Sequence, residues 1–212
     1  MRKQQADKNP DLNDLSRNPL KEFESWYADA LSSGEKHPDS MTLSTCTKRG
    51  RPSGRIVLYK GLSKGRFCIF TNYGSRKGHE LIENPFASLT FHWKLLDRQV
   101  RVEGRVFKMS RRESEKYFHS RPRTSQLGAW ASKQSSPIPN REYLLARVKH
   151  FELMFQDRTI PIPENWGGFH LIPERIEFWI DGEFRLHDRF EYSRKVSASG
   201  TPGKWSRCRV SP

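Results

Sequence analysis

The sequence predicts a mainly β domain, an antiparallel barrel with peripheral helices, and two observations carry this expectation. Between residues 41 and 107, apolar and polar residues alternate in five short segments, which is the periodicity of half-buried strands. Most of these segments are joined by short turns that contain glycine, proline or charged residues. Such turns suit antiparallel pairing better than the helical crossovers of a parallel sheet.

A helix and a flexible arm are expected ahead of the strands. The apolar positions between Leu20 and Leu31 recur at helical spacing and predict an amphipathic helix, which Ser33 and Gly34 end. Residues 1–15 are polar and show no periodicity. We therefore expect a flexible N-terminal arm over residues 1–15 and a single domain over residues 16–212.

Local patterns predict the remaining elements. Strands are expected over residues 41–47, 55–59, 66–71, 86–93, 99–107, 169–172, 176–179, 190–192 and 205–210. Helices are expected after Ser75, after the capping box of Ser110 and Glu113, and over the apolar positions from Leu144 to Phe155. Residues 194–204 are rich in Ser, Gly and Lys and predict a loop.

Composition limits the class of protein. Of the 212 residues, 34% are hydrophobic and 12% are aromatic, so we expect an economical core that is completed partly between subunits. The polar N-terminus has no signal segment, and no apolar run is long enough for a membrane span. Three scattered cysteines favour reduced thiols and offer no metal-ligand spacing. We expect a cytoplasmic protein with no metal site and no membrane partner.

The net charge of +14 calls for an anionic partner or a well-solvated surface. The basic residues stand singly or in pairs among Gly, Ser, Gln and aromatic residues rather than in one block. This distribution suits phosphorylated small molecules as well as it suits polynucleotides, and a solvated basic surface is the simplest alternative. We expect no functional nucleic-acid partner, so duplex DNA should bind weakly and dissociate near physiological salt.

Two basic clusters lie beside predicted strands in the first half of the chain. Arg55 and Lys60 stand at the two ends of an apolar strand, where they could hold a ligand along it or simply be solvated. Ser75 is a candidate N-cap for a helix whose first turn contains Arg76 and Lys77. Two cations oppose the helix dipole at that end, which favours a bound anion such as a phosphate.

Two further clusters follow the predicted barrel strands. Tyr117, Arg121 and Ser125 are spaced four residues apart and could bind a second phosphate, although a basic turn at a helix end is the simpler reading. The segment 133–136 offers amides and hydroxyls that could hydrogen-bond a heterocycle or a phosphate. Its composition is equally typical of an ordinary loop.

A last cluster lies near the C-terminus. Arg185, His187 and Arg189 alternate with Leu186 and Asp188. On a strand, the three basic side chains would share one face and repel one another unless an anion lay between them. His187 and Asp188 would then point to opposite faces, which argues against a catalytic dyad.

Together these segments resemble the pyridoxine/pyridoxamine 5′-phosphate oxidase family over about residues 18–212. Motifs in the family's order carry the resemblance, and they are residues 55–60, 75–77, 98–100, 117–122, 134–136, 166–168 and 185–189. The resemblance implies a split β-barrel FMN-binding fold and a homodimer with FMN in clefts at the interface. It also implies an oxidase that converts pyridoxine 5′-phosphate and pyridoxamine 5′-phosphate into pyridoxal 5′-phosphate, with O2 as electron acceptor and H2O2 as product.

The resemblance also implies the roles of individual residues. FMN would be contacted by Arg55, Ile56, Val57, Leu58, Lys60, Phe70, Thr71, Arg76, Lys77, Gln99, Gln134, Ser135, Trp179 and Arg189. The substrate would be contacted by Lys60, Tyr117, Arg121, Ser125, Arg185 and His187, of which Arg185 and His187 would be catalytic.

Two other classes of protein stay open. A different split-barrel flavoprotein, such as a flavin reductase or a haem-degrading relative, would keep the FMN contacts and lack the substrate contacts. A non-enzymatic protein that binds pyridoxal phosphate or nucleic acid would lack oxidase activity. One departure concerns the arm: family members often carry a Tyr shortly after an N-terminal Arg as part of a lid, whereas here Arg2 is followed by Gln4 and Gln5.

Overall fold

The computed structural model describes residues 11–212. Its helices are α1 (Pro19–Ser32), α2 (Arg76–Glu83), α3 (Arg111–Ser120), α4 (Arg123–Ala131) and α5 (Arg141–Met154), with short 3-10 turns at Lys94–Leu96 and Glu183–Arg185. Its strands are β1 (Ser40–Cys46), β2 (Pro52–Leu58), β3 (Leu62–Ser63), β4 (Arg66–Asn72), β5 (Phe86–Trp93), β6 (Arg98–Lys108), β7 (Trp166–Ile180), β8 (Asp188–Ser193) and β9 (Ser206–Arg209). Within residues 11–212, none of the helices is both long enough and apolar enough to cross a bilayer.

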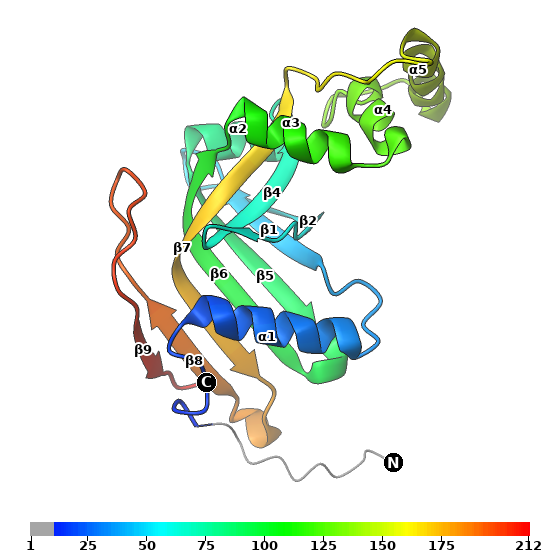
Figure 1. Ribbon diagram of the computed structural model, residues 1–212. Helices are drawn as coiled ribbons and strands as arrows, with labels where there is room; N and C mark the ends of the chain where they lie inside the picture. The colour runs from blue at the N-terminus through cyan, green and yellow to red at the C-terminus, as the bar shows by residue number, and fades with distance from the viewer. Residues whose placement is uncertain (1–10) are drawn as a thin grey trace.

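The strands form one antiparallel sheet in the order β2-β1-β5-β6-β7-β4-β3, with β8 and β9 added beside β7. The long strand β7 organises it, because it pairs with β6 from Phe169 to its end, with β4 over its first half and with β8 over its second half. The curled sheet does not close, since its path ends at β2 on one side and at β3 on the other (Figure 1). The predicted split β-barrel with peripheral helices is confirmed.

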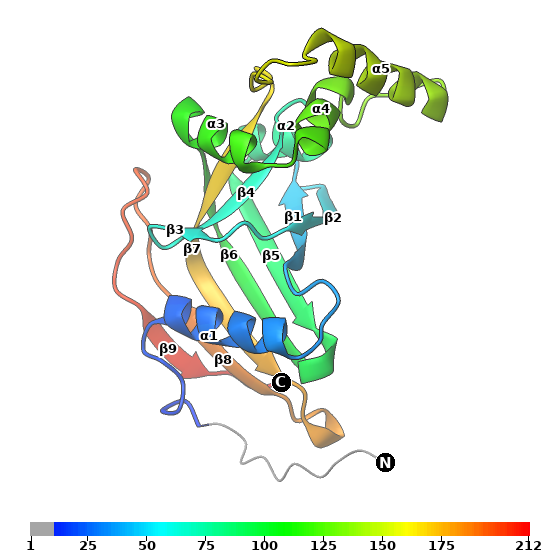
Figure 2. The same ribbon diagram turned by 45° about the vertical axis from the view of Figure 1, so that its right-hand side comes forward.

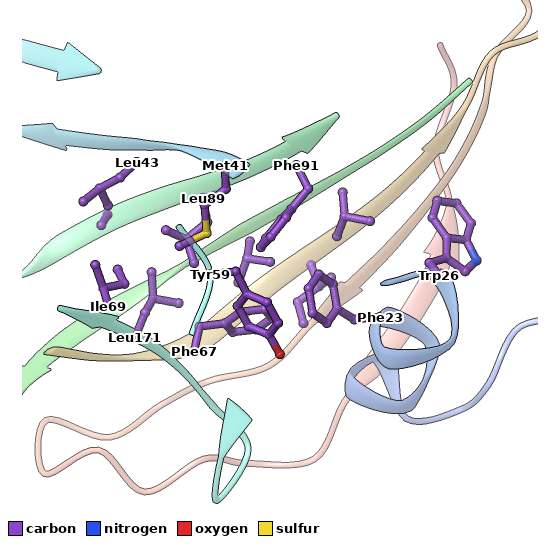
Figure 3. Packing of buried hydrophobic residues seen from close by; sticks show 14 of the residues in the cluster. Phe23, Trp26, Met41, Leu43, Tyr59, Phe67, Ile69, Leu89, Phe91 and Leu171 are labelled. Atoms are coloured by element: carbon purple, nitrogen blue, oxygen red, sulfur yellow. The ribbon is translucent and has the colours of Figure 1, made fainter. Parts of the chain in front are cut away.

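The core lies inside the curl of the sheet. Leu43, Phe91 and Leu171, from three different strands, are fully buried and point toward one another (Figure 3). Helix α1 closes this core with Phe23, whose ring lies 5.0 Å from that of Phe91, and with Trp26. Helices α2 to α5 gather at the opposite end of the barrel (Figures 1 and 2). Helix α1 therefore covers one end of the barrel, and a cleft can form at the other end, beside α2 to α5.

Two predicted strands turn out to be one. Residues 169–172 and 176–179 both belong to β7, which runs without interruption past Pro173. Pro173 lies between the two predicted segments, and a proline cannot donate to a ladder. The structure accommodates it at a bulge, where the register between β6 and β7 shifts between Glu103 and Gly104. Helix α4 and the two-residue strand β3 were not predicted.

The expected flexible arm falls mostly on residues 1–10, outside the described residues, as does the departure at Arg2, Gln4 and Gln5. Its last part is packed against the domain. Leu15 is buried, and the Arg207 guanidinium donates to the carbonyl oxygens of Leu12 and Leu15. The structured part of the chain thus begins before residue 16.

Candidate functional site

A cleft of about 980 Å³ lies where β2 and β4 meet helices α2 to α4. Most residues expected to bind a cofactor or a substrate line it. They are Arg55, Ile56, Val57, Leu58, Lys60, Phe70, Thr71, Arg76, Lys77, Tyr117, Arg121, Ser125, Gln134 and Ser135. The fold thereby brings four of the five sequence clusters into one cavity, which is large enough for a cofactor and a small substrate together.

Cations at the start of α2 line one side of the cleft. The Ser75 side chain caps this helix by accepting from the Gly78 amide, as expected. The Lys77 ammonium donates to Gln134 at 2.9 Å and to Thr71 at 3.3 Å, which ties the distant segment around Gln134 to β4 and α2. Burial, followed by the charge of Arg55, lowers the pKa of Lys77. An anion bound at this point would offset both effects.

Glu80 organises the two arginines of this cluster, and the sequence reasoning missed it. Its carboxylate is buried, accepts from Arg76 Nε at 2.9 Å and lies 3.4 Å from Arg55 Nη2. Although burial raises its pKa, hydrogen bonds from Ser53, Thr45 and Arg76 and the charge of Arg55 hold the pKa at about 2. The spacing of four residues between Arg76 and Glu80 on one helix was the available signal.

Removing the Glu80 charge is expected to destabilise the fold. Glu80→Gln should lower the free energy of unfolding by about 1.5–3 kcal/mol near neutral pH, because it weakens charged hydrogen bonds. The folded-state pKa of about 2 lies below the ordinary 4.5, so this stabilisation is complete above pH 4.5 and is lost as pH falls toward 2. Urea unfolding at pH 7 and at pH 3 measures the loss. The exposed Glu83→Gln on the same helix is the control, and equal losses for both variants would contradict the assignment.

The other side of the cleft is aromatic and carries one cation. The Tyr117 ring stacks on Phe70, with ring centroids 3.7 Å apart, and Trp166 stacks on Phe70 at 5.8 Å. The Arg121 guanidinium lies 4.7 Å above the Trp166 ring. Burial raises the pKa of Tyr117, so its hydroxyl stays protonated and can donate.

Arg121 carries a donor without a partner. Its Nη1 is buried and has no hydrogen-bond partner among residues 11–212, and burial lowers the pKa of its guanidinium. Nε of Arg101 and Nε of Arg105 are also buried without a hydrogen-bond partner in this part of the chain, but neither of those residues lines the cleft. A buried cation with an unsatisfied donor is costly unless an anion binds it, so Arg121 is a candidate anion-binding residue.

The fourfold spacing of Tyr117, Arg121 and Ser125 does not reflect one continuous helix. Helix α3 ends at Ser120, Arg121 has an extended backbone, and Ser125 belongs to α4. Proline at position 122 forces this break, because the residue before a proline disfavours helical angles. The three side chains nevertheless line the same cleft, since the two helices meet at this corner.

Five expected site residues lie elsewhere, and we name them the distal group: Gln99, Trp179, Arg185, His187 and Arg189. Gln99, Trp179 and Arg189 are directly opposite one another on β6, β7 and β8, so they share one face of the sheet. The His187 ring lies 4.8 Å from the Trp179 ring. Arg189 is fixed by the buried Glu177 carboxylate at 2.7 Å.

The shared strand face considered for Arg185, His187 and Arg189 is not formed. Glu183–Arg185 forms a 3-10 turn, with positive φ angles at Phe184 and Arg185, and β8 begins only at Asp188. Arg185 and His187 therefore do not project from a strand face with Arg189. A tight turn needs these angles, and alternation alone could not signal it.

The distal group cannot join the cleft of its own chain. Trp166 lines the cleft and Trp179 belongs to the distal group, and both lie on β7. Trp179 lies thirteen residues after Trp166 on this strand, or roughly 40 Å of extended chain. Figure 1 shows β7 running from the helical end of the barrel to the opposite end. A single chain thus holds two separate parts of the expected site.

The fold and the cleft define a split-barrel protein with two cationic groups facing one cavity. Residues 28–155 match the sequence model of the family described as pyridoxamine 5′-phosphate oxidase. Residues 166–212 match the model described as the pyridoxine 5′-phosphate oxidase C-terminal dimerisation region. The chain belongs to the pyridoxine/pyridoxamine 5′-phosphate oxidase family, as the sequence motifs indicated, and it is an oxidoreductase of that family.

Relatives cover nearly the whole chain. The pyridoxine/pyridoxamine 5′-phosphate oxidase of Coxiella burnetii is 50% identical over 199 residues, which are 94% of this chain and 98% of that protein. The protein of the same name from Paraburkholderia xenovorans is 49% identical over 202 residues, covering 95% and 92%.

Two solved structures have the same fold. PhzG from Burkholderia lata, in complex with tetrahydrophenazine-1-carboxylic acid, superposes with a TM-score of 0.88 at 27% identity over 98% of both chains. A pyridoxamine 5′-phosphate oxidase-related, FMN binding protein from Nostoc punctiforme superposes with a TM-score of 0.68 at 16% identity, over 90% of this chain and 97% of that one. The second likeness bears on the fold alone.

Proposed function

We propose that this enzyme oxidises pyridoxine 5′-phosphate and pyridoxamine 5′-phosphate to pyridoxal 5′-phosphate, with FMN as cofactor, O2 as electron acceptor and H2O2 as product. The observation that carries the proposal is a single cleft with two separate cationic sites, one at the start of α2 and one at Arg121. Two phosphorylated ligands, a cofactor and a vitamin, match two such sites. The reduced thiols expected from the sequence fit a cytoplasmic location, which we propose with it.

The cleft has the donor set that FMN needs. Arg55, Arg76 and Lys77 offer charged donors for its phosphate, and Gln134 and Ser135 stand beside them. The exposed strand β2, with its backbone and the side chains of Ile56 and Leu58, offers an apolar edge for a flat ring system. When bound, FMN supplies the acceptor for the two electrons of the oxidation.

The residues around Arg121 would position the substrate. Arg121 Nη1 would take the substrate phosphate as its missing partner, with hydroxyls from Tyr117 and Ser125 beside it. The wall of Phe70, Tyr117 and Trp166 excludes water from that side of the cavity. Holding the phosphate there fixes the orientation of the pyridine ring, so the reacting carbon meets the cofactor in one geometry.

The distal group would complete the site from a second copy of the chain. Arg185 and His187 would lie over the substrate, and Gln99, Trp179 and Arg189 would contact FMN. His187 Nδ1 lies 3.1 Å from the Asp181 carboxylate and 3.2 Å from the Gly182 amide, and these contacts orient the ring. Its other nitrogen, Nε2, would face the substrate alcohol or amine and form a hydrogen bond with it. The family model for residues 166–212 is a dimerisation region, which supports this arrangement.

Turnover with purified protein tests the proposal. Incubation with pyridoxine 5′-phosphate in air should yield pyridoxal 5′-phosphate and one H2O2 per product. Pyridoxine without its phosphate should be a poor substrate, because Arg121 would stay unpaired. Tetrahydrophenazine-1-carboxylic acid, the ligand of the PhzG structure, is the alternative substrate. Oxidation of that compound without oxidation of pyridoxine 5′-phosphate would contradict the proposal.

We expect the protein to be a yellow dimer. Two half-sites about 40 Å apart along one strand can form a complete site only if two copies associate. Sedimentation at micromolar concentration should give about twice the chain mass of 24.9 kDa, with one FMN per chain. A monomer saturated with FMN and fully active would contradict the two-copy site.

A further inference from the structure

The turn that carries Arg185 and His187 also presents an aromatic side chain to solvent. Phe184 is 90% exposed, more than any other large hydrophobic residue among residues 11–212, and Leu186 is 67% exposed. Single exposed apolar residues are ordinary on a protein surface. Here two of them flank Arg185, which is proposed to bind substrate.

This exposure is built into the backbone. Phe184 and Arg185 have φ angles of 55° and 64°, in the left-handed region that bulky residues avoid. The Leu186 amide donates to the Glu183 carbonyl at 3.0 Å, and a Cβ on Gly182 would lie 2.3 Å from the Leu186 carbonyl oxygen. The turn is therefore closely packed, and it holds the Phe184 ring outward in a conformation that costs energy. Such strain concentrates at functional positions.

The sheet shows where that ring can go. Ile56 on β2 stands opposite Thr42, and the pairing continues through Thr90 and Arg101 to Glu177 on β7. Ile56 on β2 and Trp179 on β7 therefore face the same side of the sheet. In a two-fold dimer any contact between two surfaces forms twice, so the turn of each copy can meet β2 of the other.

We propose that Phe184 is an apolar anchor that seats the Arg185–His187 turn in the cleft of the partner copy, against the apolar edge formed by Ile56 and Leu58. This inference rests on the two-copy site of the proposed function. Ile56 and Leu58 are 66% and 45% exposed on each chain, so both surfaces lose solvent contact on docking. An aromatic ring on a rigid turn loses little conformational entropy when it binds. Phe184 acts on Arg185 and His187 by positioning them.

Phe184→Asn removes the ring and keeps the turn, because asparagine tolerates the left-handed backbone. Each dimer contains the contact twice, so a tenfold loss per contact raises the dimer dissociation constant about a hundredfold. Sedimentation of the FMN-loaded full chain over a dilution series measures this constant. The KM for pyridoxine 5′-phosphate should rise under dilution and recover at high protein concentration. Phe184→Tyr should behave like the wild type, and so should Leu31→Asn, a control 57% exposed on α1.

A double-mutant cycle identifies the partner surface. Ile56 also lines the proposed FMN site, so the variants are compared at equal FMN content. Ile56→Asn alone should then weaken the dimer, and adding Phe184→Asn should weaken it little further, because both changes remove one contact. Phe184→Asn could also destabilise the chain itself, which would show as a lower melting temperature. In that case the test rests on Ile56→Asn, which still has to weaken the dimer. A wild-type dimer constant for Phe184→Asn in an active yellow enzyme, or additive effects in the cycle, would overturn the anchor and leave the proposed function intact. An inactive or colourless wild type would instead overturn the function, and the anchor with it.

Discussion

Arg121→Ala should raise the KM for pyridoxine 5′-phosphate by roughly ten- to a hundredfold and leave FMN content nearly unchanged. The guanidinium has an unpaired buried donor above the Trp166 ring, and an anion is the partner that position lacks. Losing one charge-assisted phosphate contact costs about 1.5–3 kcal/mol. Steady-state kinetics and absorbance of the bound flavin measure the two effects on one preparation.

Arg76→Ala is the matched variant on the other side of the cleft. It should release FMN and have little effect on the KM of the enzyme that is still loaded, since Arg76 is held by Glu80 at the start of α2. Arg121→Lys should recover part of the loss, because lysine keeps the charge and loses the planar fork. Equal effects of Arg76→Ala and Arg121→Ala on both ligands would show that the two phosphates are assigned wrongly.

Arg185→Ala should lower kcat/KM by about a hundredfold, a size typical of a lost charged donor at a reacting centre, and leave FMN bound. His187→Asn should lower turnover in the same way, because it removes the ring that is proposed to contact the substrate. That ring packs on Trp179, and its Nδ1 contacts the Gly182 amide. If His187 merely packs against the sheet, the melting temperature of His187→Asn falls while turnover at a permissive temperature stays normal. Measuring FMN content, melting temperature and turnover together separates the two roles.

The fold could be predicted closely from local patterns. The alternation over residues 86–93 predicted β5 with its observed bounds, and the capping box of Ser110 and Glu113 predicted the start of α3. The limits lay where tertiary contacts override local signals. Pro173 reads as a strand end in sequence, and only its partner Gly104 on β6 shows that β7 continues. The 3-10 turn before β8 had no periodic signature at all.

Most residues of the candidate site could be named from the sequence, whereas their arrangement in space could not. The cations at Arg76 and Lys77 stood out because they oppose a helix dipole, and the cleft contains both. Glu80 escaped notice because a carboxylate on a helix is usually solvated, and its burial against Arg55 depends on β1 and β2. That Trp166 and Trp179 lie at opposite ends of one strand could not be seen before β7 was known to be continuous.

Complementation between two impaired variants tests the two-copy site most directly, with substrate far below the KM of each variant, where both are nearly inactive. Arg121→Ala damages the cleft and Arg185→Ala damages the turn, and co-expression with different tags yields hybrid dimers. If each site combines the cleft of one copy with the turn of the other, every hybrid has one intact site and one doubly damaged site. Random pairing makes half of all dimers hybrids, so the mixture should reach about a quarter of wild-type activity.

A control pairs Arg121→Ala with Arg76→Ala, whose hybrids have no intact site because both changes fall in the cleft half. That mixture should stay as inactive as the separate variants. Recovery to about a quarter of wild-type activity for Arg121→Ala with Arg185→Ala, and none for the control pair, is the result that a site shared between two copies predicts. No recovery in either mixture, with hybrid dimers present, would contradict it and place the whole site within one chain.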